Sequence, residues 1–254
     1  MINIKTPEEI EIMAEGGSIL AQVMKKLERM VKPGIATLEL DRAAEALILS
    51  AGAKPAFKGY DNFPNSLCVS VNENIVHGLP SEYILKDGDI VGLDLGVLYP
   101  VKNGASAGFY TDMAITVPVG KTSSEAKRLI KVAEKSLKLG IKKAKAGNTI
   151  GDIGAEIQKF VEKKGFGVVR DLCGHGIGKN LHEDPKVPNF GEKGTGAELA
   201  EGMVIAIEPM ITMGDYNIKK SNDGYGYATK DDSLAAHFEH TVAITKSGPE
   251  ILTL

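Results

Sequence analysis

Apolar residues recur at helical spacing from Ile10 to Leu27, and this pattern predicts an amphipathic first helix. The helix is expected to begin after Thr6, because Thr6 and Glu9 have the spacing of a capping box and a proline between them fits the first turn. The breaking sequence Lys32-Pro33-Gly34 predicts its end.

Capping and breaking residues predict three further helices. They run from Thr37 to about Ala51, from Thr122 to about Lys145, and from Thr149 to Lys164. The third opens on a second capping-box pattern, Thr122-Ser-Ser-Glu125. Lys32-x-Gly34 and Lys145-x-Gly147 lie 113 residues apart, and so do Gly52 and Gly165. This order of helix, Lys-x-Gly, helix and glycine indicates an internal repeat.

Apolar strand segments that carry carboxylates repeat in the same way. One predicted strand closes on Asp94 and another on Glu208, at an offset of 114 residues, and each follows a glycine turn. A later strand in each half carries Asp112 or Glu239. We therefore predict an α+β fold with two halves, about 1–120 and about 121–254, related by a pseudo-twofold axis within a single domain. Antiparallel sheets would lie inside and helices outside.

Composition narrows the class of protein. The chain has 254 residues, a net charge of −3 and a pI near 6.0, so its overall charge makes no case for a nucleic-acid partner, and we expect no specific nucleic acid. The lysines at 142, 143 and 145 are interpreted as a solvated helix face. Neither a long apolar run nor a signal-peptide pattern is present, so we expect no membrane partner. Cys68 and Cys173 form no Cys-x-x-Cys motif, which favours a reducing cytoplasm.

The segment from Asp171 to Pro185 alternates glycines with His175 and also contains His182. Glycines without a Cβ allow another backbone, a metal or a substrate to come close. A tight turn with a surface histidine is the alternative interpretation. The Gly-x-Gly-x-Gly pattern is only a weak indication of phosphate binding, because no helix signal follows it.

Four carboxylates that converge without cations would repel one another and take up protons. No lysine or arginine lies beside Asp94, Asp112, Glu208 or Glu239 in the predicted strands. Carboxylates with one imidazole, His175, suit Mn, Fe, Co or Zn. Four acids exceed what one catalytic ion usually needs, so we predict two divalent ions about 3.5–4 Å apart.

The chain resembles the type I methionine aminopeptidases, which have the pita-bread fold. The resemblance extends from the first helix to the C-terminal Glu-Ile-Leu-Thr. It is carried by Pro55-Ala-Phe-Lys-Gly-Tyr60, the segment Phe63–Glu73, Val76-His-Gly-Leu-Pro80, Gly174-His-Gly-Ile-Gly178, Glu208-Pro-Met210 and Glu239-His-Thr241. His175 and Glu208 are 33 residues apart, which leaves no room for the long insertion of type II enzymes.

The resemblance implies a set of metal ligands. In it, Asp112 and Glu239 bridge two divalent ions, Asp94 completes one site, and His175 with Glu208 completes the other. The ions implied are Co, Mn, Fe, Zn or Ni.

The resemblance also implies residues that act on the substrate. His77 and His182 would contact the scissile peptide and stabilise its tetrahedral intermediate, and Glu208 would also move the proton of the attacking water. Five residues would form a methionine pocket, and an apolar, sulfur-tolerant pocket suits a thioether. They are Tyr60, Phe63, Cys68, Leu181 and Tyr225.

Three departures from the family pattern stand out. Asp94 and Asp112 are 18 residues apart, several more than usual, and the extra residues in 98–108 predict an enlarged hairpin tip. We interpret this insertion as a tolerated surface loop rather than a partner-binding element. Thr111 replaces a glycine and Leu181 an aromatic residue, which bears on substrate range.

Other interpretations of the histidines stay open from sequence. His77 could be a core or turn residue, and His182 could simply pair with Glu183 or Asp184. His240 should point to the opposite strand face from Glu239, so we interpret it as structural. We interpret His237 as structural as well.

Three functions compete. The first is a cytoplasmic, monomeric metallo-aminopeptidase that removes the initiator methionine of nascent chains when the second residue is small. It would act by attack of a metal-bridging hydroxide on the peptide carbonyl and would contact the ribosome transiently. The second is an X-Pro peptidase on the same fold, which usually carries an N-terminal domain not expected here. The third is a peptide-binding protein without catalysis, but such relatives typically lose metal ligands.

Overall fold

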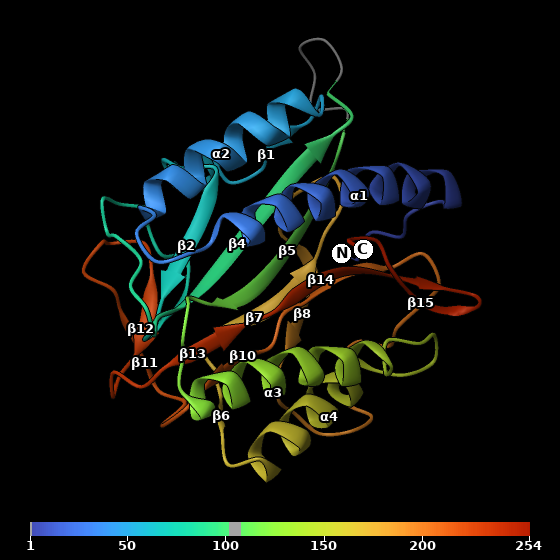
Figure 1. Ribbon diagram of the computed structural model, residues 1–254. Coiled ribbons are helices and arrows are strands. Elements are labelled where there is room, and N and C mark those ends of the chain that lie inside the picture. Colours follow the sequence, from blue (N-terminus) through green and yellow to red (C-terminus); the bar gives the residue numbers. More distant parts are fainter. Residues whose placement is uncertain (1, 102–107) are drawn as a thin grey trace.

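The computed structural model describes residues 2–101 and 108–254. Strands lie between two pairs of helices, α1 with α2 and α3 with α4, and each pair packs on the strands of its own half (Figure 1). The helices are α1 (Pro7–Met30), α2 (Thr37–Ser50), α3 (Ser124–Ile141) and α4 (Ile150–Lys163), with a short 3-10 turn at Tyr60–Asn62. None of the helices in these two ranges is long and apolar enough to cross a lipid bilayer.

The largest sheet of the described chain has nine strands and runs through both halves. Its main path is β1-β4-β5-β14-β9-β7-β8, with β2 on β4 and β15 on β14. Its strands are β1 (Lys54–Pro55), β2 (Leu67–Val71), β4 (Ile90–Tyr99), β5 (Phe109–Pro118), β7 (Cys173–Gly176), β8 (Glu183–Pro188), β9 (Val204–Ile207), β14 (Glu239–Thr245) and β15 (Gly248–Ile251). The two halves meet where β5 pairs with β14 in antiparallel fashion, so their acidic strands are adjacent.

Two small sheets complete the arrangement. Their strands are β3 (Asn74–Val76), β11 (Ile218–Lys220) and β12 (Tyr227–Thr229) in one, and β6 (Gly167–Val168), β10 (Met210–Thr212) and β13 (Ala235–His237) in the other. Strand β13 runs into β14 through a single residue, Phe238. The second small sheet therefore borders the central pair of acidic strands.

The predicted internal repeat is confirmed by equivalent backbone contacts in the two halves. Gly34 and Gly147 both have left-handed backbone conformations, with φ of +94° and +86°. The N–H of Gly34 donates to the carbonyl of Leu85, and the N–H of Gly147 donates to the carbonyl of Leu199, both at 2.9 Å. Because glycine adopts positive φ without a steric penalty, each Lys-x-Gly turn can place its helix pair against its strands in the same way.

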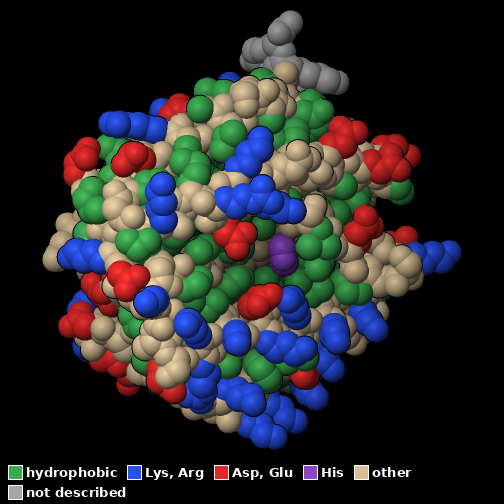
Figure 2. Space-filling view, in the orientation of Figure 1, with side chains coloured by type: hydrophobic (Ala, Val, Ile, Leu, Met, Phe, Trp, Pro, Cys, Tyr) green, Lys and Arg blue, Asp and Glu red, His purple; other side chains and the backbone are tan. Residues whose placement is uncertain are grey.

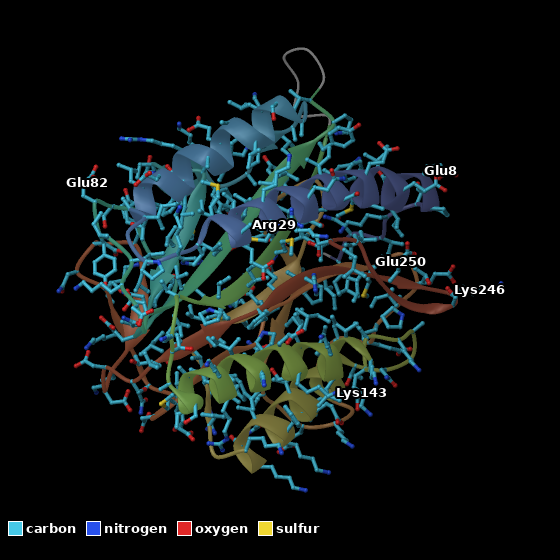
Figure 3. The ribbon with its side chains drawn as sticks, viewed as in Figure 1. Glu8, Arg29, Glu82, Lys143, Lys246 and Glu250 are labelled. Carbon is cyan, nitrogen blue, oxygen red and sulfur yellow. The ribbon has the colours of Figure 1, made fainter. Side chains whose placement is uncertain are left out.

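The cores follow the helical spacing of apolar residues. One buried cluster joins Leu20 and Leu27 of α1 to Leu93 of β4, and its counterpart joins Leu137 of α3 to Ile205 of β9. The opposite helix faces are charged, and side chains such as Glu8 and Arg29 of α1 point outward (Figure 3). Amphipathic helices thus cover the sheet with their apolar faces, as predicted.

The start of the first helix is confirmed. Thr6 is its N-cap, with its Oγ1 accepting from the N–H of Glu9 at 3.3 Å while the Glu9 carboxylate accepts from the N–H of Thr6 at 3.0 Å. This reciprocal pair satisfies two backbone donors that the helix itself leaves unpaired.

The predicted bounds of the third helix are wrong at both ends. Ser123, not Thr122, is the N-cap, because its hydroxyl accepts from the N–H of Ala126 at 3.1 Å while Thr122 is buried. The helix ends at Ile141 rather than near Lys145. Beyond it the N–H of Ala144 donates to the carbonyl of Ile141, three residues back, which tightens the chain into a turn.

Strand β4 extends past the point expected from sequence. Asp94 was predicted to close its strand, but it lies in the middle of β4, which continues to Tyr99. The reason is that β5 pairs with all ten residues of β4, ending with Tyr99 opposite Phe109. The predicted hairpin tip falls within 98–108, and its residues 102–107 lie outside the described part of the chain.

Candidate metal centre

Sheet register brings the predicted metal ligands together. Asp94 of β4 lies opposite Ala114 of β5, and Glu239 of β14 lies opposite the same alanine from the other side. Asp112 is two residues from Ala114 and therefore points to the same face. Glu208 directly follows Ile207 of β9, at the next register position toward Glu239. Acids distant in sequence are thus placed on one face across the junction of the two halves.

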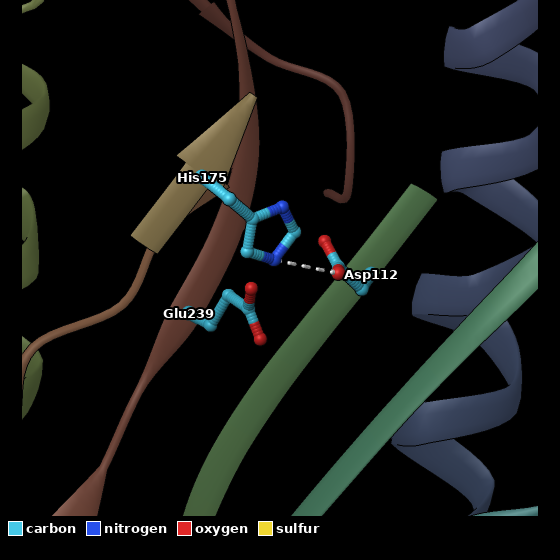
Figure 4. Close-up of side chains that lie close together, drawn as sticks. All are labelled: Asp112, His175 and Glu239. Carbon is cyan, nitrogen blue, oxygen red and sulfur yellow. Dashed lines mark ion pairs between the residues drawn. The ribbon is translucent and has the colours of Figure 1, made fainter. Parts of the chain in front are cut away.

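His175 completes the cluster from β7. Its Nε2 lies 3.5 Å from Oδ2 of Asp112 and 3.7 Å from Oε1 of Glu208. Ligand atoms of Asp112, His175 and Glu239 all lie within 4.8 Å of one another (Figure 4). Such a spacing could accommodate one ion among three donors.

Hydrogen bonds hold two of the predicted ligands in place. Nδ1 of His175 lies 2.8 Å from the carbonyl oxygen of Gly176, so that Nε2 faces the acids. Oγ1 of Thr241 accepts from the N–H of Asp112 at 3.0 Å and lies 2.8 Å from its carbonyl oxygen. Contacts of this kind orient metal ligands before an ion arrives.

The electrostatics of the cluster favour a cation. Burial raises the pKa of Asp94 to about 7 and that of Glu208 to about 8, and repulsion from Asp112 adds to both shifts. Burial also raises the pKa of Asp112, and burial together with the neighbouring acids raises the pKa of Glu239 well above its usual range. Without cations Asp94 and Glu208 therefore retain protons near neutral pH.

The residues present fit divalent ions. Oδ1 of Asp94 is buried and has no hydrogen-bond partner among the described residues, although a buried carboxylate oxygen normally requires one. A coordinating cation would satisfy this oxygen and offset the repulsion between the acids. Carboxylates with one imidazole are the donor set expected for borderline transition metals.

All twelve side chains that the sequence predicts as metal ligands, catalytic residues or pocket residues lie around one cavity of about 470 Å³. His77 and His182 are among them. Burial lowers the pKa of both imidazoles to about 4, with help from neighbouring histidines, so both are neutral at pH 7. Their rings can therefore donate or accept a hydrogen bond in the cavity without carrying charge.

His182 is held by an aromatic side chain and not by its acidic neighbour. Its Nδ1 lies 2.8 Å from the hydroxyl of Tyr60, and its ring centroid lies 4.4 Å from that of His175. Glu183 instead pairs with Lys5 at 2.7 Å. The alternative in which Glu183 simply pairs with His182 is therefore wrong.

The predicted pocket residues form a largely apolar part of the cavity. The rings of Phe63 and Tyr225 meet edge to face at 5.5 Å, and Leu181 is buried. Cys68 lies opposite Asp94 in the sheet, and burial raises the pKa of its thiol well above the usual range. A protonated thiol among apolar side chains is suited to packing rather than to nucleophilic chemistry.

Phe57 and His237 are among the residues near the site that sequence reasoning missed. Phe57 lines the cavity and packs so closely on Gly96 that a Cβ there would lie 2.8 Å from its ring. His237, interpreted as structural, has its Nε2 3.5 Å from Oε2 of Glu208. Strand alternation could have indicated this position, because His237 precedes Glu239 by two residues.

An oxygen-rich donor set at the junction of two repeated halves, inside a pita-bread fold, defines a class of metal-dependent hydrolases. The chain belongs to metallopeptidase family M24, which it matches over residues 11–246. It is a metallopeptidase, and membership of this family implies binding of divalent metal.

Known relatives agree over the full length. A methionine aminopeptidase of Clostridium perfringens is 51% identical over 254 residues, covering 100% of this chain and 99% of the relative. The crystal structure of methionine aminopeptidase from Rickettsia prowazekii matches with a TM-score of 0.95 and 40% identity, covering 100% of both chains. The prolidase of Pyrococcus horikoshii matches with a TM-score of 0.78 and 25% identity, and the match covers 99% of this chain but only 63% of the prolidase. The predicted pita-bread fold and the resemblance to methionine aminopeptidases are confirmed.

Proposed function

We propose that this protein is a methionine aminopeptidase that uses two divalent ions to remove the initiator methionine from nascent chains when the second residue is small. The observation that carries the proposal is the gathering of Asp94, Asp112, His175, Glu208 and Glu239 around one cavity that apolar side chains also line. Identity of 51% to a methionine aminopeptidase over the whole chain supports the substrate class.

The proposed ligands divide between two ions. Asp112 and Glu239 would contribute to holding both ions, which agrees with their shared position beside the strand junction. Asp94 would help to hold one ion, and His175 with Glu208 would help to hold the other. When bound, such ions lower the pKa of a water from about 15.7 towards 7 and polarise a peptide carbonyl.

The side chains around the centre handle the substrate. His77 and His182 are neutral at pH 7 and can donate hydrogen bonds to the peptide oxygen as charge develops there. The hydroxyl of Tyr60 orients His182 through its Nδ1. Glu208, whose pKa is raised to about 8 by burial, is suited to taking a proton from water and returning it to the leaving amine.

Specificity would come from the two ends of the cavity. Phe63, Cys68, Leu181 and Tyr225 provide an apolar surface for an unbranched thioether side chain. The free α-amine of the substrate would lie among the carboxylates, which attract a cation or an amine and would reject a continuing peptide chain. This arrangement favours removal of one N-terminal residue over cleavage within a chain.

The test is release of methionine from the peptide Met-Ala-Ser. We expect activity that a chelator abolishes and that Mn²⁺ or Co²⁺ restores. His182→Ala should lose turnover, whereas the matched control His240→Ala should retain it. Nδ1 of His240 lies 2.9 Å from Oγ1 of Thr253, and His240 does not line the cavity. Equal or faster cleavage of X-Pro peptides would favour a prolidase-like activity instead, and metal-loaded protein inert on both would favour peptide binding alone.

The proposal includes a setting for the enzyme in the cell. We propose a cytoplasmic monomer that meets nascent chains by brief contact with the ribosome. Lys and Arg side chains gather over α3 and α4 (Figure 2), and such a basic surface would favour contact with ribosomal RNA without a specific nucleic-acid site. Co-sedimentation with ribosomes that is lost at high salt would support this setting, and salt-independent absence of binding would refute it.

A further inference from the structure

His237 is a buried histidine that has no role in the proposed reaction. Its side chain is at the end of β13, and the residue is 3% exposed. Nε2 has no hydrogen-bond partner within residues 2–101 and 108–254. Leaving a buried polar nitrogen unpaired is unfavourable, so a partner is expected when the site is in its working form.

The position of this ring is fixed by the sheet. Oγ1 of Thr116, on β5, accepts from the N–H of His237 at 2.9 Å and donates to its carbonyl oxygen at 2.8 Å. On the other side His237 pairs with Met210 of β10. A backbone held from two strands can aim its side chain with little freedom.

The ring is aimed at the carboxylate of Glu208. Nε2 of His237 lies 3.5 Å from Oε2, whereas Oε1 lies 3.7 Å from Nε2 of His175. The Glu208 carboxylate therefore lies between two imidazoles. Each carboxylate oxygen has its own neighbour.

Hydrogen-bonding capacity decides which group donates. A Glu208 carboxylate that coordinates a cation is ionised and can only accept hydrogen bonds. The imidazole of His237 carries at least one N–H and can donate it. The tautomer that satisfies both groups has the hydrogen on Nε2.

We propose that His237 is a positioning residue that donates its Nε2–H to Oε2 of Glu208 and thereby presents Oε1 to the metal. This inference rests on the proposed role of Glu208 as a metal ligand. It predicts that the N–H group of residue 237, rather than its volume, sets the affinity of the site that contains Glu208.

The chain offers a matched control three residues away. His240 is also partly buried and also close to a ligand in sequence, but its Nδ1 bonds Oγ1 of Thr253 at 2.9 Å. Replacing it changes a nearby imidazole without touching Glu208.

The test is calorimetric titration of chelator-stripped protein with Mn²⁺, so it does not depend on turnover. His237→Phe, which keeps a ring but lacks the donor, should bind one ion about 10–100-fold more weakly. His237→Gln, whose amide can donate, should bind close to wild type, and His240→Gln should be unchanged. In a Glu208→Gln background, His237→Phe should cause no further loss. The Tm of each stripped variant checks folding, and His237→Ala replaces the phenylalanine variant if that one does not fold.

Any of three results would overturn the inference. Variants without a donor at position 237 could bind Mn²⁺ as tightly as wild type, or His237→Phe and His237→Gln could lose the same Mn²⁺ affinity. The third such result is that His237→Phe lowers Mn²⁺ affinity as much in the Glu208→Gln background as in wild type. If these occur while wild-type protein binds two ions and releases methionine, the proposed function stands and only the role of His237 falls. If wild-type protein binds no divalent ion, both fall together.

Discussion

Replacing Asp94 with asparagine should stabilise the metal-free protein while weakening its binding of divalent ions. The substitution keeps the shape of a side chain that is 8% exposed and removes a charge from a cluster of acids. Because Oδ1 of Asp94 has no hydrogen-bond partner in the described chain, the asparagine amide at this position breaks no hydrogen bond to that oxygen. Stability and metal affinity should therefore change in opposite directions.

The size of the effect follows from the pKa. Burial raises the pKa of Asp94 from 3.8 to about 7. A difference of about 3 units corresponds to roughly 4 kcal/mol between its charged and neutral forms, at 1.36 kcal/mol per unit. This is a ceiling, because the neighbouring acids share the repulsion and readjust their protons. We expect a gain of about 1–4 kcal/mol at pH 8, which raises Tm by several degrees in a protein of this size.

The assay is thermal unfolding in chelator at pH 8, followed by titration with Mn²⁺. A matched control is Asp41→Asn, because Asp41 is also buried but accepts from the Asn65 amide at 2.6 Å and from the N–H groups of Ser66 and Leu67 at 2.8 and 3.0 Å. That variant should lose stability, by about 1–3 kcal/mol. A lower Tm for Asp94→Asn than for wild type, together with unchanged metal affinity, would refute the reasoning.

Three further predictions follow from the site. Between pH 7 and 8.5 the metal-free protein in chelator should lose stability as pH rises. Asp94 and Glu208 have folded pKa values of about 7 and 8, above their unfolded values, so the folded state binds more protons than the unfolded state. Denaturant unfolding measures this dependence, and a stability that stays flat or rises with pH would contradict it. His77→Ala should lose turnover but keep its metal content, and loss of metal instead would make His77 a ligand. Cys68→Ala should retain turnover and raise KM for methionyl peptides, since its thiol is protonated; abolished turnover with normal metal content would argue against a packing role.

Local signals predicted the parts of the fold that depend on a few neighbouring residues. Thr6 caps its helix as expected, and the glycine turns at Gly34 and Gly147 match because both need the same backbone conformation. The third helix was placed wrongly, because Thr122 and Ser123 carry equally good capping hydroxyls. Burial of one hydroxyl, which depends on tertiary packing, decides between them.

Long-range pairing explains what local signals missed. The length of β4 is set by its partner β5, so the position of Asp94 inside the strand cannot be read from its own segment. The acids themselves were identified because charged groups interrupt apolar strands at equivalent places in a repeat. His237 was missed because its role depends on its contact with Glu208, which lies far from it in sequence at the end of β9.

The central claim is that acids from both halves of the chain converge to bind the ions needed for peptide hydrolysis. Its most direct test is to titrate chelator-stripped protein with Mn²⁺ and to measure bound metal and methionine release from Met-Ala-Ser in the same samples. The account predicts no turnover in stripped protein and a rate that rises with bound metal. Full activity after thorough removal of metal, verified by elemental analysis, would contradict it.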